Sequence, residues 1–269
     1  MAIIDVNGAS LHYEIQGFGP PLLLVMGASG DGGHFAPMAR LLAEEFTVVS
    51  YDRRGNGRSP RPKGWTTTTP QEQAADAAAL VRALGLGPVA VFGTSSGATF
   101  ALCLLVDHPG VVRGCILHEP VIAPLYDDPS AAGAAAALAA RTLEEGGGAA
   151  LLMERFWRMV AGDEGWEALD PGLRARMRDT AATFAEVELG TFEDYLPDDS
   201  ALARIAVPVR LLVSQDGRAP QQQAARRLAR RLGTTVKQVP GSHAPYADHP
   251  RQTAAAVAAL ARQFPGAPV

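Results

Sequence analysis

The segment GTSSG at positions 93–97 constrains this chain most, because a G-x-S-x-G pattern stands there between two apolar runs of different character. Residues 88–92 (PVAVF) are typical of a buried strand, and residues 98–108 (ATFALCLLVDH) favour a helix. A serine between a strand and a helix lies at a sharp turn, where flanking glycines avoid clashes. The pattern therefore predicts a nucleophile elbow that exposes the hydroxyl of Ser95. It also places the amide of Ser96 at a helix N-terminus, where free N–H groups favour a developing oxyanion.

Strand-like and helix-like segments alternate along most of the chain. An antiparallel edge strand is expected at 11–16 and buried strands are expected at 22–26 and 47–51. Further strands are expected at 88–92, 113–117, 207–213 and 234–239. Helices are expected from Pro70 to about Leu84, at 98–108, at 221–232 and after Pro250, the first of them opened by a capping box of Thr69 and Glu72. This alternation predicts an α/β fold with a mostly parallel central sheet and helices on both faces.

Between residues 121 and 204 the alternation stops. No buried strand is evident there, and the sequence favours helices, with an alanine run at 131–140 and a glycine interruption at 146–148. Because strands resume afterwards, the stretch is expected to be an insertion in one sheet-containing domain. We therefore expect a core formed by residues 1–120 and 205–269 and an inserted helical lid formed by 121–204.

Composition narrows the classes of protein and partner. Of 269 residues, 47% are hydrophobic and 19% are charged, as in a globular protein. The net charge of −4 and the lack of a basic patch give no reason to expect a nucleic-acid partner. No segment resembles a membrane span or a signal peptide, so a cytoplasmic location is expected, while the oligomeric state stays open. Cys103 and Cys115 lie in apolar runs and are expected to be packed free thiols.

Five blocks give the chain a resemblance to the α/β-hydrolase superfamily, over most of its length outside the expected lid. They are VMGASG (25–30), YDRRGNGRS (51–59), GTSSGA (93–98), HPGVVRG (108–114) and VPGSHAPYADHP (239–250). The combination is specific for the fold and much less so for the substrate, because the superfamily includes esterases, lactonases, C–C hydrolases and receptors. A serine at the elbow counts against the family's haloalkane dehalogenases and epoxide hydrolases, which need an aspartate there.

The resemblance also implies a base. Of the six histidines, only His243 stands in a P-G-x-H block after the last expected strand, where the family places its general base. Other histidines are more simply interpreted as structural: His12, His34, His108 and His249.

Two residues compete for the acid of the triad. Asp216 follows the strand that ends at Val213 and precedes His243, which is the family's chain order, and we favour it on that ground. Its loop, SQDGRAP, is one residue shorter before the aspartate than the family's pattern, with Ser214 in place of the usual glycine. The rival is Glu119, which directly follows the strand at 113–117, where some members carry a relocated acid.

The resemblance implies an oxyanion hole formed by the backbone amides of Ala28 and Ser96. The family usually has His-Gly-x after the strand at 22–26, whereas this chain has Met26-Gly27-Ala28. Because the donors are backbone groups, losing the histidine need not abolish the hole. No metal or organic cofactor is expected to be required.

These assignments predict a serine hydrolase that cleaves a small to medium, apolar ester or lactone through an acyl-enzyme intermediate. The expected lid supplies apolar side chains for an acyl pocket or for core packing: Met153, Phe156, Trp157, Met159, Trp166, Phe184, Phe192 and Tyr195. A cofactor-free C–C hydrolase, a perhydrolase or haloperoxidase-like enzyme, and a non-catalytic ligand receptor are the alternatives.

The block YDRRGNGRS is dense in charge and glycine, yet we expect it to be structural. It follows the strand at 47–51 and is interpreted as a turn in which Asp52 and Arg54 pair with each other or bond backbone groups.

Overall fold

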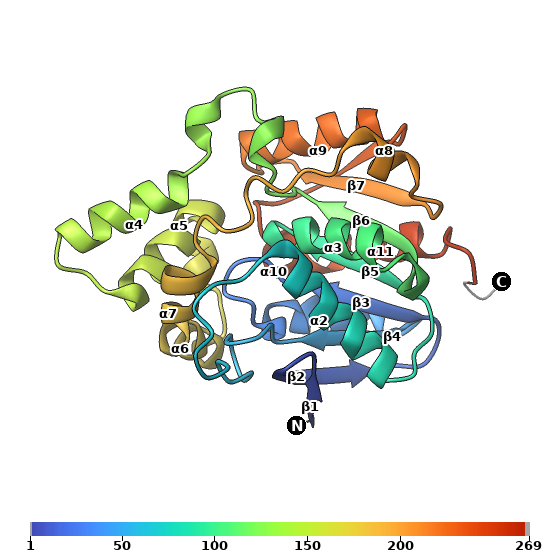
Figure 1. Ribbon diagram of the computed structural model, residues 1–269, viewed down its shortest axis with the longest axis horizontal. Helices are drawn as coiled ribbons and strands as arrows, with labels where there is room; N and C mark the ends of the chain where they lie inside the picture. Colours follow the sequence, from blue (N-terminus) through green and yellow to red (C-terminus); the bar gives the residue numbers. More distant parts are fainter. Residues whose placement is uncertain (1, 267–269) are drawn as a thin grey trace.

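In the computed structural model, which describes residues 2–266, one eight-stranded sheet runs through the core (Figure 1). The strands are β1 (Ala2–Val6), β2 (Ala9–Gln16), β3 (Pro21–Val25), β4 (Thr47–Tyr51), β5 (Val89–Thr94), β6 (Val112–His118), β7 (Val209–Ser214) and β8 (Val236–Val239). Their order across the sheet is β1-β2-β4-β3-β5-β6-β7-β8, and all pairs from β4 onward are parallel. The prediction of a mostly parallel central sheet is confirmed.

The predicted edge strand is wrong in one respect. β2 pairs antiparallel with β4 on one side and with β1 on the other, so β1 is the edge. Asn7 and Gly8 connect β1 to β2 with φ values of 47° and 73°, the left-handed backbone of a two-residue hairpin turn.

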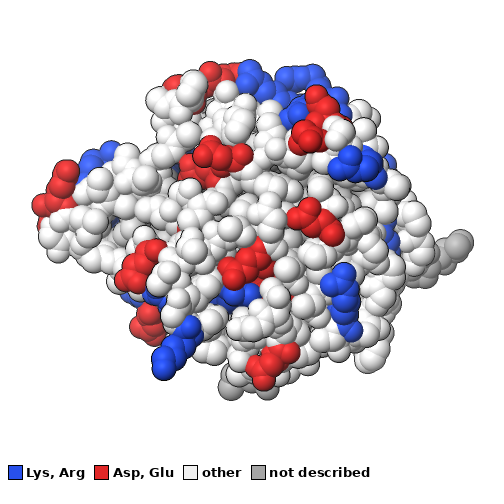
Figure 2. Space-filling model, in the orientation of Figure 1, with Lys and Arg blue, Asp and Glu red and all other residues white. Residues whose placement is uncertain are grey.

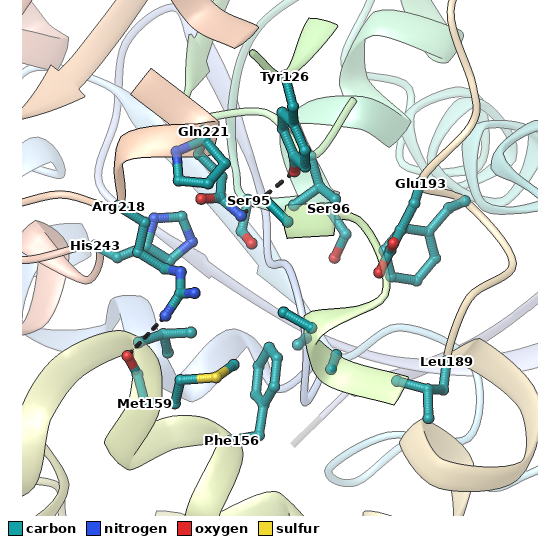
Figure 3. A pocket seen from close by; sticks show the side chains of 18 of the residues that line it. Ser95, Ser96, Tyr126, Phe156, Met159, Leu189, Glu193, Arg218, Gln221 and His243 are labelled. Atoms are coloured by element: carbon teal, nitrogen blue, oxygen red, sulfur yellow. Dashed lines mark hydrogen bonds between the residues drawn. The ribbon is translucent and has the colours of Figure 1, made fainter. Parts of the chain in front are cut away.

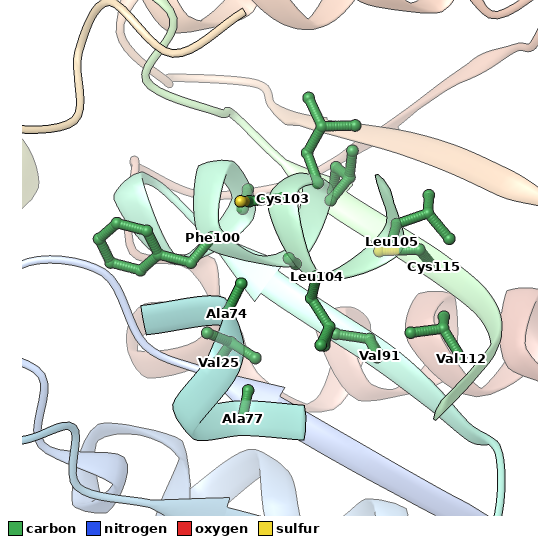
Figure 4. Packing of buried hydrophobic residues seen from close by; sticks show 14 of the residues in the cluster. Val25, Ala74, Ala77, Val91, Phe100, Cys103, Leu104, Leu105, Val112 and Cys115 are labelled. Atoms are coloured by element: carbon green, nitrogen blue, oxygen red, sulfur yellow. The ribbon is translucent and has the colours of Figure 1, made fainter. Parts of the chain in front are cut away.

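Helices cover both faces of the sheet, as predicted. One face carries α2 (Pro70–Ala83), α3 (Ser96–Asp107) and α9 (Ala219–Arg231), and the other carries α1 (Ala36–Leu42), α10 (Pro245–Asp248) and α11 (Pro250–Ala261). Side chains alternate along each buried strand, so Leu23 packs with the first layer while Leu22 and Leu24 pack with the second. Figure 4 shows α3 lying on the sheet beside α2, with Cys103 and Cys115 among the packed apolar side chains; both cysteines are buried free thiols, as predicted.

Helix α2 begins where the sequence predicts, but with half of the expected capping box. Thr69 Oγ1 accepts a hydrogen bond from the backbone N–H of Glu72 at 3.1 Å, and Pro70 occupies the first turn. The Glu72 carboxylate instead accepts from Thr68 Oγ1 at 2.8 Å, from Trp65 Nε1 at 2.9 Å and from Arg54 Nη1 at 2.7 Å. The side chain therefore secures the preceding loop.

The chain between β6 and β7 contains helices and turns and, within the described residues, no strand. Its helices are α4 (Ala134–Glu144), α5 (Ala149–Glu167), α6 (Pro171–Asp179), α7 (Ala181–Thr183) and α8 (Asp199–Ala203), with a π-helical turn at Phe184–Glu188. The break between α4 and α5 falls at the predicted glycine interruption. Helices α4 to α7 lie together at the left of Figure 1, to one side of the sheet.

Acidic and basic side chains are interspersed on the face of the molecule shown in Figure 2. Charged side chains also form exposed ion pairs, for example Arg262 with Glu45 at 2.5 Å, and such pairs contribute little stability individually. None of the helices described between residues 2 and 266 is long and apolar enough to cross a membrane.

In the turn after β4, Asp52 and Arg54 do not pair with each other. The carboxylate of Asp52 accepts from Gly32 N–H at 2.8 Å and from Arg58, while Arg54 binds Asp76 at 2.5 Å. The predicted pair of Asp52 and Arg54 is thus replaced by two separate ion pairs, and both residues also bond backbone groups as expected.

Candidate active site

Ser95 occupies a strained turn between β5 and α3. Its φ of 56° and ψ of −131° lie outside the regions that L-residues usually adopt. Its backbone N–H donates to His118 O at 2.9 Å, which ties the turn to the end of β6. A Cβ added at Gly93 would lie 2.5 Å from Gly97 O, and one added at Gly97 would lie 2.3 Å from Val25 O. The close packing of strand and helix therefore requires both glycines, and the predicted elbow geometry is present.

His243 hydrogen-bonds to Glu119 and not to Asp216. The distance from His243 Nδ1 to Glu119 Oε2 is 2.5 Å, and the two side chains are 5% and 0% exposed. Asp216 is exposed, its backbone N–H donates to Gly241 O at 2.9 Å, and its carboxylate makes no hydrogen bond or ion pair within the described residues. The preference for Asp216 as the partner of His243 is therefore wrong. The carboxylate that contacts His243 belongs to Glu119, the rival candidate.

The backbone around Glu119 explains how the carboxylate reaches the imidazole. Glu119 follows β6 directly with a φ of 43°, and its N–H donates to Leu212 O at 3.1 Å. Its Oε1 accepts from the backbone N–H of Ser214 at 2.8 Å. A Cβ added at Gly217 would lie 1.8 Å from Glu119 Oε1, so the loop that contains Asp216 leaves the room that Glu119 fills.

The environment keeps Glu119 ionised. Burial raises the pKa of a carboxyl group, but here the hydrogen bond with His243 and the N–H of Ser214 lower the pKa of Glu119 below its usual value. An ionised Glu119 can accept the Nδ1 proton of His243, which leaves Nε2 of that ring free to accept another proton.

Sequence reasoning missed His118, the last residue of β6. Its Nδ1 lies 2.9 Å from Thr94 Oγ1 and its Nε2 lies 3.0 Å from Ser214 Oγ, and the ring centroid is 5.9 Å from that of His243. Burial lowers the pKa of His118 to about 4. This neutral ring packs beside the pair of His243 and Glu119. The position of His118 directly before Glu119 is the feature of the sequence that could have indicated this role.

We expect buried histidines to make the fold sensitive to acid. Burial lowers the pKa of His34 and His118 to about 4 from 6.5. The unfolded chain therefore binds protons that the folded chain rejects, so stability is complete above about pH 6.5 and is lost as the pH falls towards 4. Each of these two buried histidines should lower the free energy of unfolding by on the order of 1 kcal/mol per pH unit in that window.

Urea unfolding of wild type and His118→Asn from pH 7 to 4 tests this expectation. The variant should lose stability less steeply, and parallel curves would contradict the assignment.

The loop after β3 lies against the elbow. A Cβ added at Gly27 would lie 2.8 Å from Ser95 Cβ, and Ala28 shares a pocket with Ser95 and Ser96. Within residues 2–266, the backbone N–H groups of Ala28 and Ser96 donate to no protein acceptor. Both predicted oxyanion donors are therefore free at the pocket that contains the Ser95 side chain.

This pocket joins the elbow to the helical insertion (Figure 3). His243 and Arg218 lie on one side, Glu193 and Leu189 lie across from them, and Phe156 and Met159 of α5 close the floor. Ser95 Oγ and His243 both face the pocket, without a hydrogen bond between them in the described chain. Among residues 2–266, no group of three or more His, Cys, Asp or Glu side chains is placed to hold a metal ion.

The apolar side chains of the insertion divide into two groups. The pocket is lined by Phe156, Met159, Phe184 and Phe192. The others do not line it: Met153, Trp157, Trp166 and Tyr195. Trp157 is buried and stacks on His34 with ring centroids 4.4 Å apart, so it packs the insertion against the core.

Comparison with known proteins identifies the family of the chain. Residues 20–152 match a family model described as the alpha/beta hydrolase fold. The chain is 31% identical over 252 residues to the uncharacterized hydrolase YraK of Bacillus subtilis (strain 168), covering 90% of this chain and 89% of the relative. The chain belongs to the α/β-hydrolase superfamily.

Two further comparisons, one with a curated relative and one with a solved structure of the same fold, each cover nearly the whole chain. A zearalenone hydrolase of Cladophialophora bantiana is 27% identical over 277 residues, covering 97% of this chain and 96% of the relative. The solved structure of a thermophilic esterase from Thermogutta terrifontis superposes with a TM-score of 0.77 at 23% identity, covering 98% of this chain and 99% of that one. The protein is thus an enzyme of the hydrolase type.

Proposed function

We propose that the protein is a serine hydrolase in which Ser95, His243 and Glu119 act as nucleophile, base and acid. The observation that carries the proposal is one pocket that contains a strained elbow serine and a histidine whose Nδ1 is held at 2.5 Å by a buried carboxylate. In this scheme Nε2 of His243 takes the proton of Ser95 as the serine oxygen attacks an acyl carbon. The N–H groups of Ala28 and Ser96 would then donate to the oxyanion.

The second half of the reaction uses the same groups. His243 gives its proton to the leaving alcohol, and the acyl group stays on Ser95. A water molecule then enters, loses a proton to His243 and attacks the acyl carbon. The bond from that carbon to Ser95 Oγ breaks, His243 returns the proton to Ser95, and the acid is released. Glu119 keeps its charge throughout and stabilises the imidazolium that forms in each half-reaction.

The substrate class follows from the pocket walls. Apolar side chains from α5 and from the segment after α7 line one part of the pocket, while Tyr126, Arg218 and Gln221 provide polar groups at one side. Such walls suit an apolar acyl or ring-containing group more than a sugar. We therefore propose a small to medium apolar ester or lactone as substrate, with residues 121–204 acting as the lid over it.

A panel of substrates tests this proposal. It contains p-nitrophenyl esters from acetate to decanoate, aliphatic and aromatic lactones, and zearalenone because of the relative that carries that name. The proposal expects turnover of at least one apolar ester or lactone with release of the carboxylic acid. If the purified protein hydrolyses none of these compounds, the proposed substrate class is contradicted.

Removing an aromatic wall of the pocket should change chain-length preference. Phe156→Ala should lower kcat/KM for long or aromatic acyl groups about 10- to 100-fold while changing acetate much less, because the lost contact area scales with the acyl group. Trp157→Ala is the matched control, since Trp157 sits on the same helix and packs on His34 outside the pocket. The control should lose thermal stability but keep the chain-length profile. Equal profiles in Phe156→Ala and wild type would show that the acyl group binds elsewhere.

A further inference from the structure

Arg53, in the turn after β4, holds the loop that contains the proposed oxyanion donor. Its side chain is completely buried, its Nε donates to Met26 O at 3.0 Å, and its Nη2 donates to Gly27 O at 2.8 Å. These carbonyls belong to two successive peptide groups of the loop after β3. One planar guanidinium therefore fixes the orientation of both peptides.

The second of these peptide groups, Gly27–Ala28, carries the N–H that is proposed to bind the oxyanion. Gly27 C=O and Ala28 N–H are opposite ends of a single planar peptide group. A charged donor on the carbonyl draws electron density from the amide, so the N–H becomes a stronger donor, and hydrogen bonds in such a chain reinforce one another in a buried site. Arg53 thus acts on the Ala28 N–H through one peptide, without touching the pocket itself.

Glu188 of the insertion holds the other side of the guanidinium. Its Oε1 and Oε2 accept from Arg53 Nη1 and Nη2 at 2.6 and 2.9 Å, and Oε1 also accepts from Asn56 Nδ2 at 2.9 Å. Both side chains of the ion pair are 0% exposed. Glu188 ends the π-helical turn that begins with Phe184, and Phe184 and Leu189 line the pocket.

We propose that Arg53 and Glu188 are positioning residues that couple the pocket wall of the insertion to the oxyanion hole. The inference rests on the proposed function, since it concerns the Ala28 amide as an oxyanion donor. The pair fixes the plane of the Gly27–Ala28 peptide and increases the polarity of its N–H. Transition-state stabilisation then depends on a carboxylate from the insertion that contacts no substrate.

Arg53→Lys and Glu188→Gln are the first variants. A lysine ammonium keeps the charge but cannot span two carbonyls and a carboxylate with the planar fork of arginine. Loss of a whole oxyanion donor costs about 10²- to 10³-fold in kcat, so a displaced or weakened one should cost about 10- to 100-fold with KM nearly unchanged. The double variant Arg53→Met/Glu188→Met removes both buried charges, which avoids leaving one unpaired, and should show the same loss of kcat.

Arg54→Lys is the matched control. Arg54 is the next residue, is similarly buried and forms a comparable ion pair with Asp76, but in the described chain none of its side-chain hydrogen bonds reaches the loop after β3. If the effect were only structural, Arg54→Lys and Arg53→Lys would change kcat alike. The inference expects the control to keep the kcat of the wild type per folded molecule.

Inhibitor binding separates this inference from the proposed function. Phenylboronic acid forms a tetrahedral adduct on a reactive serine and places an anionic oxygen in the oxyanion hole, whereas anisole fills only the apolar pocket. Arg53→Lys, Glu188→Gln and the double variant should bind the boronic acid about 10- to 100-fold more weakly and anisole unchanged. Unchanged boronic acid affinity and kcat in any folded variant of the pair would overturn the inference. Failure of wild type to bind the boronic acid would instead contradict the proposed function.

Discussion

Ser95→Ala is expected to lower kcat on a p-nitrophenyl ester by at least about 10⁴-fold, because the attacking oxygen is removed while the binding pocket remains. The neighbouring Ser96→Ala is the matched control. The Ser96 hydroxyl is buried without a hydrogen-bond partner in the described chain, and its proposed contribution is the backbone amide. We expect the control to keep kcat within about tenfold of wild type, since alanine retains that amide.

Steady-state kinetics with active-site titration would check both variants. A Ser95→Ala protein that retains more than a small fraction of activity after repurification would contradict the assignment of the nucleophile. So would a large loss in Ser96→Ala with an intact Ser95.

The second large effect is expected at the acid. Glu119→Gln should lower kcat by about 10⁴-fold, because an amide N–H facing Nδ1 of His243 favours the tautomer that carries its proton on Nε2. That tautomer cannot accept the proton of Ser95. Asp216→Asn is the matched control and should change kcat by less than about threefold, since Asp216 is exposed and its carboxylate does not contact His243.

Circular dichroism and thermal unfolding should be measured alongside to check that Glu119→Gln folds, because Glu119 is buried and also accepts from Ser214 N–H. The glutamine can keep that second hydrogen bond through its carbonyl oxygen, so the variant should fold. A large loss in Asp216→Asn with a mild effect in Glu119→Gln would move the acid to the loop after β7.

Most of the fold could be predicted because strands and helices have different hydrophobic periods. Buried strands such as β5 are short apolar runs, and Thr69 and Pro70 mark the start of α2. β1 was missed although Asn7-Gly8, between two alternating segments, is a strong hairpin signal. The elbow was predictable because the packing around this one turn requires glycine at positions 93 and 97. That requirement appears in the sequence as the short pattern G-x-S-x-G.

The acid could not be decided from the sequence because two candidates follow neighbouring parallel strands. Glu119 follows β6 and Asp216 follows β7, so both carboxylates start from the same edge of the sheet. The choice depends on the course of the loops, and here Gly217 and the N–H of Ser214 make room for Glu119 and hold it. Arg53 was missed for a similar reason: its partners are backbone carbonyls and Glu188, which is 135 residues away.

Mass spectrometry of the protein after reaction with a fluorophosphonate tests the central proposal most directly, because the reagent reports which serine an adjacent base activates. The triad proposed here predicts one adduct, mapped to Ser95, that forms much more slowly in Glu119→Gln and at an unchanged rate in Asp216→Asn. An adduct on Ser96, or labelling of Ser95 at the wild-type rate in Glu119→Gln, would contradict it.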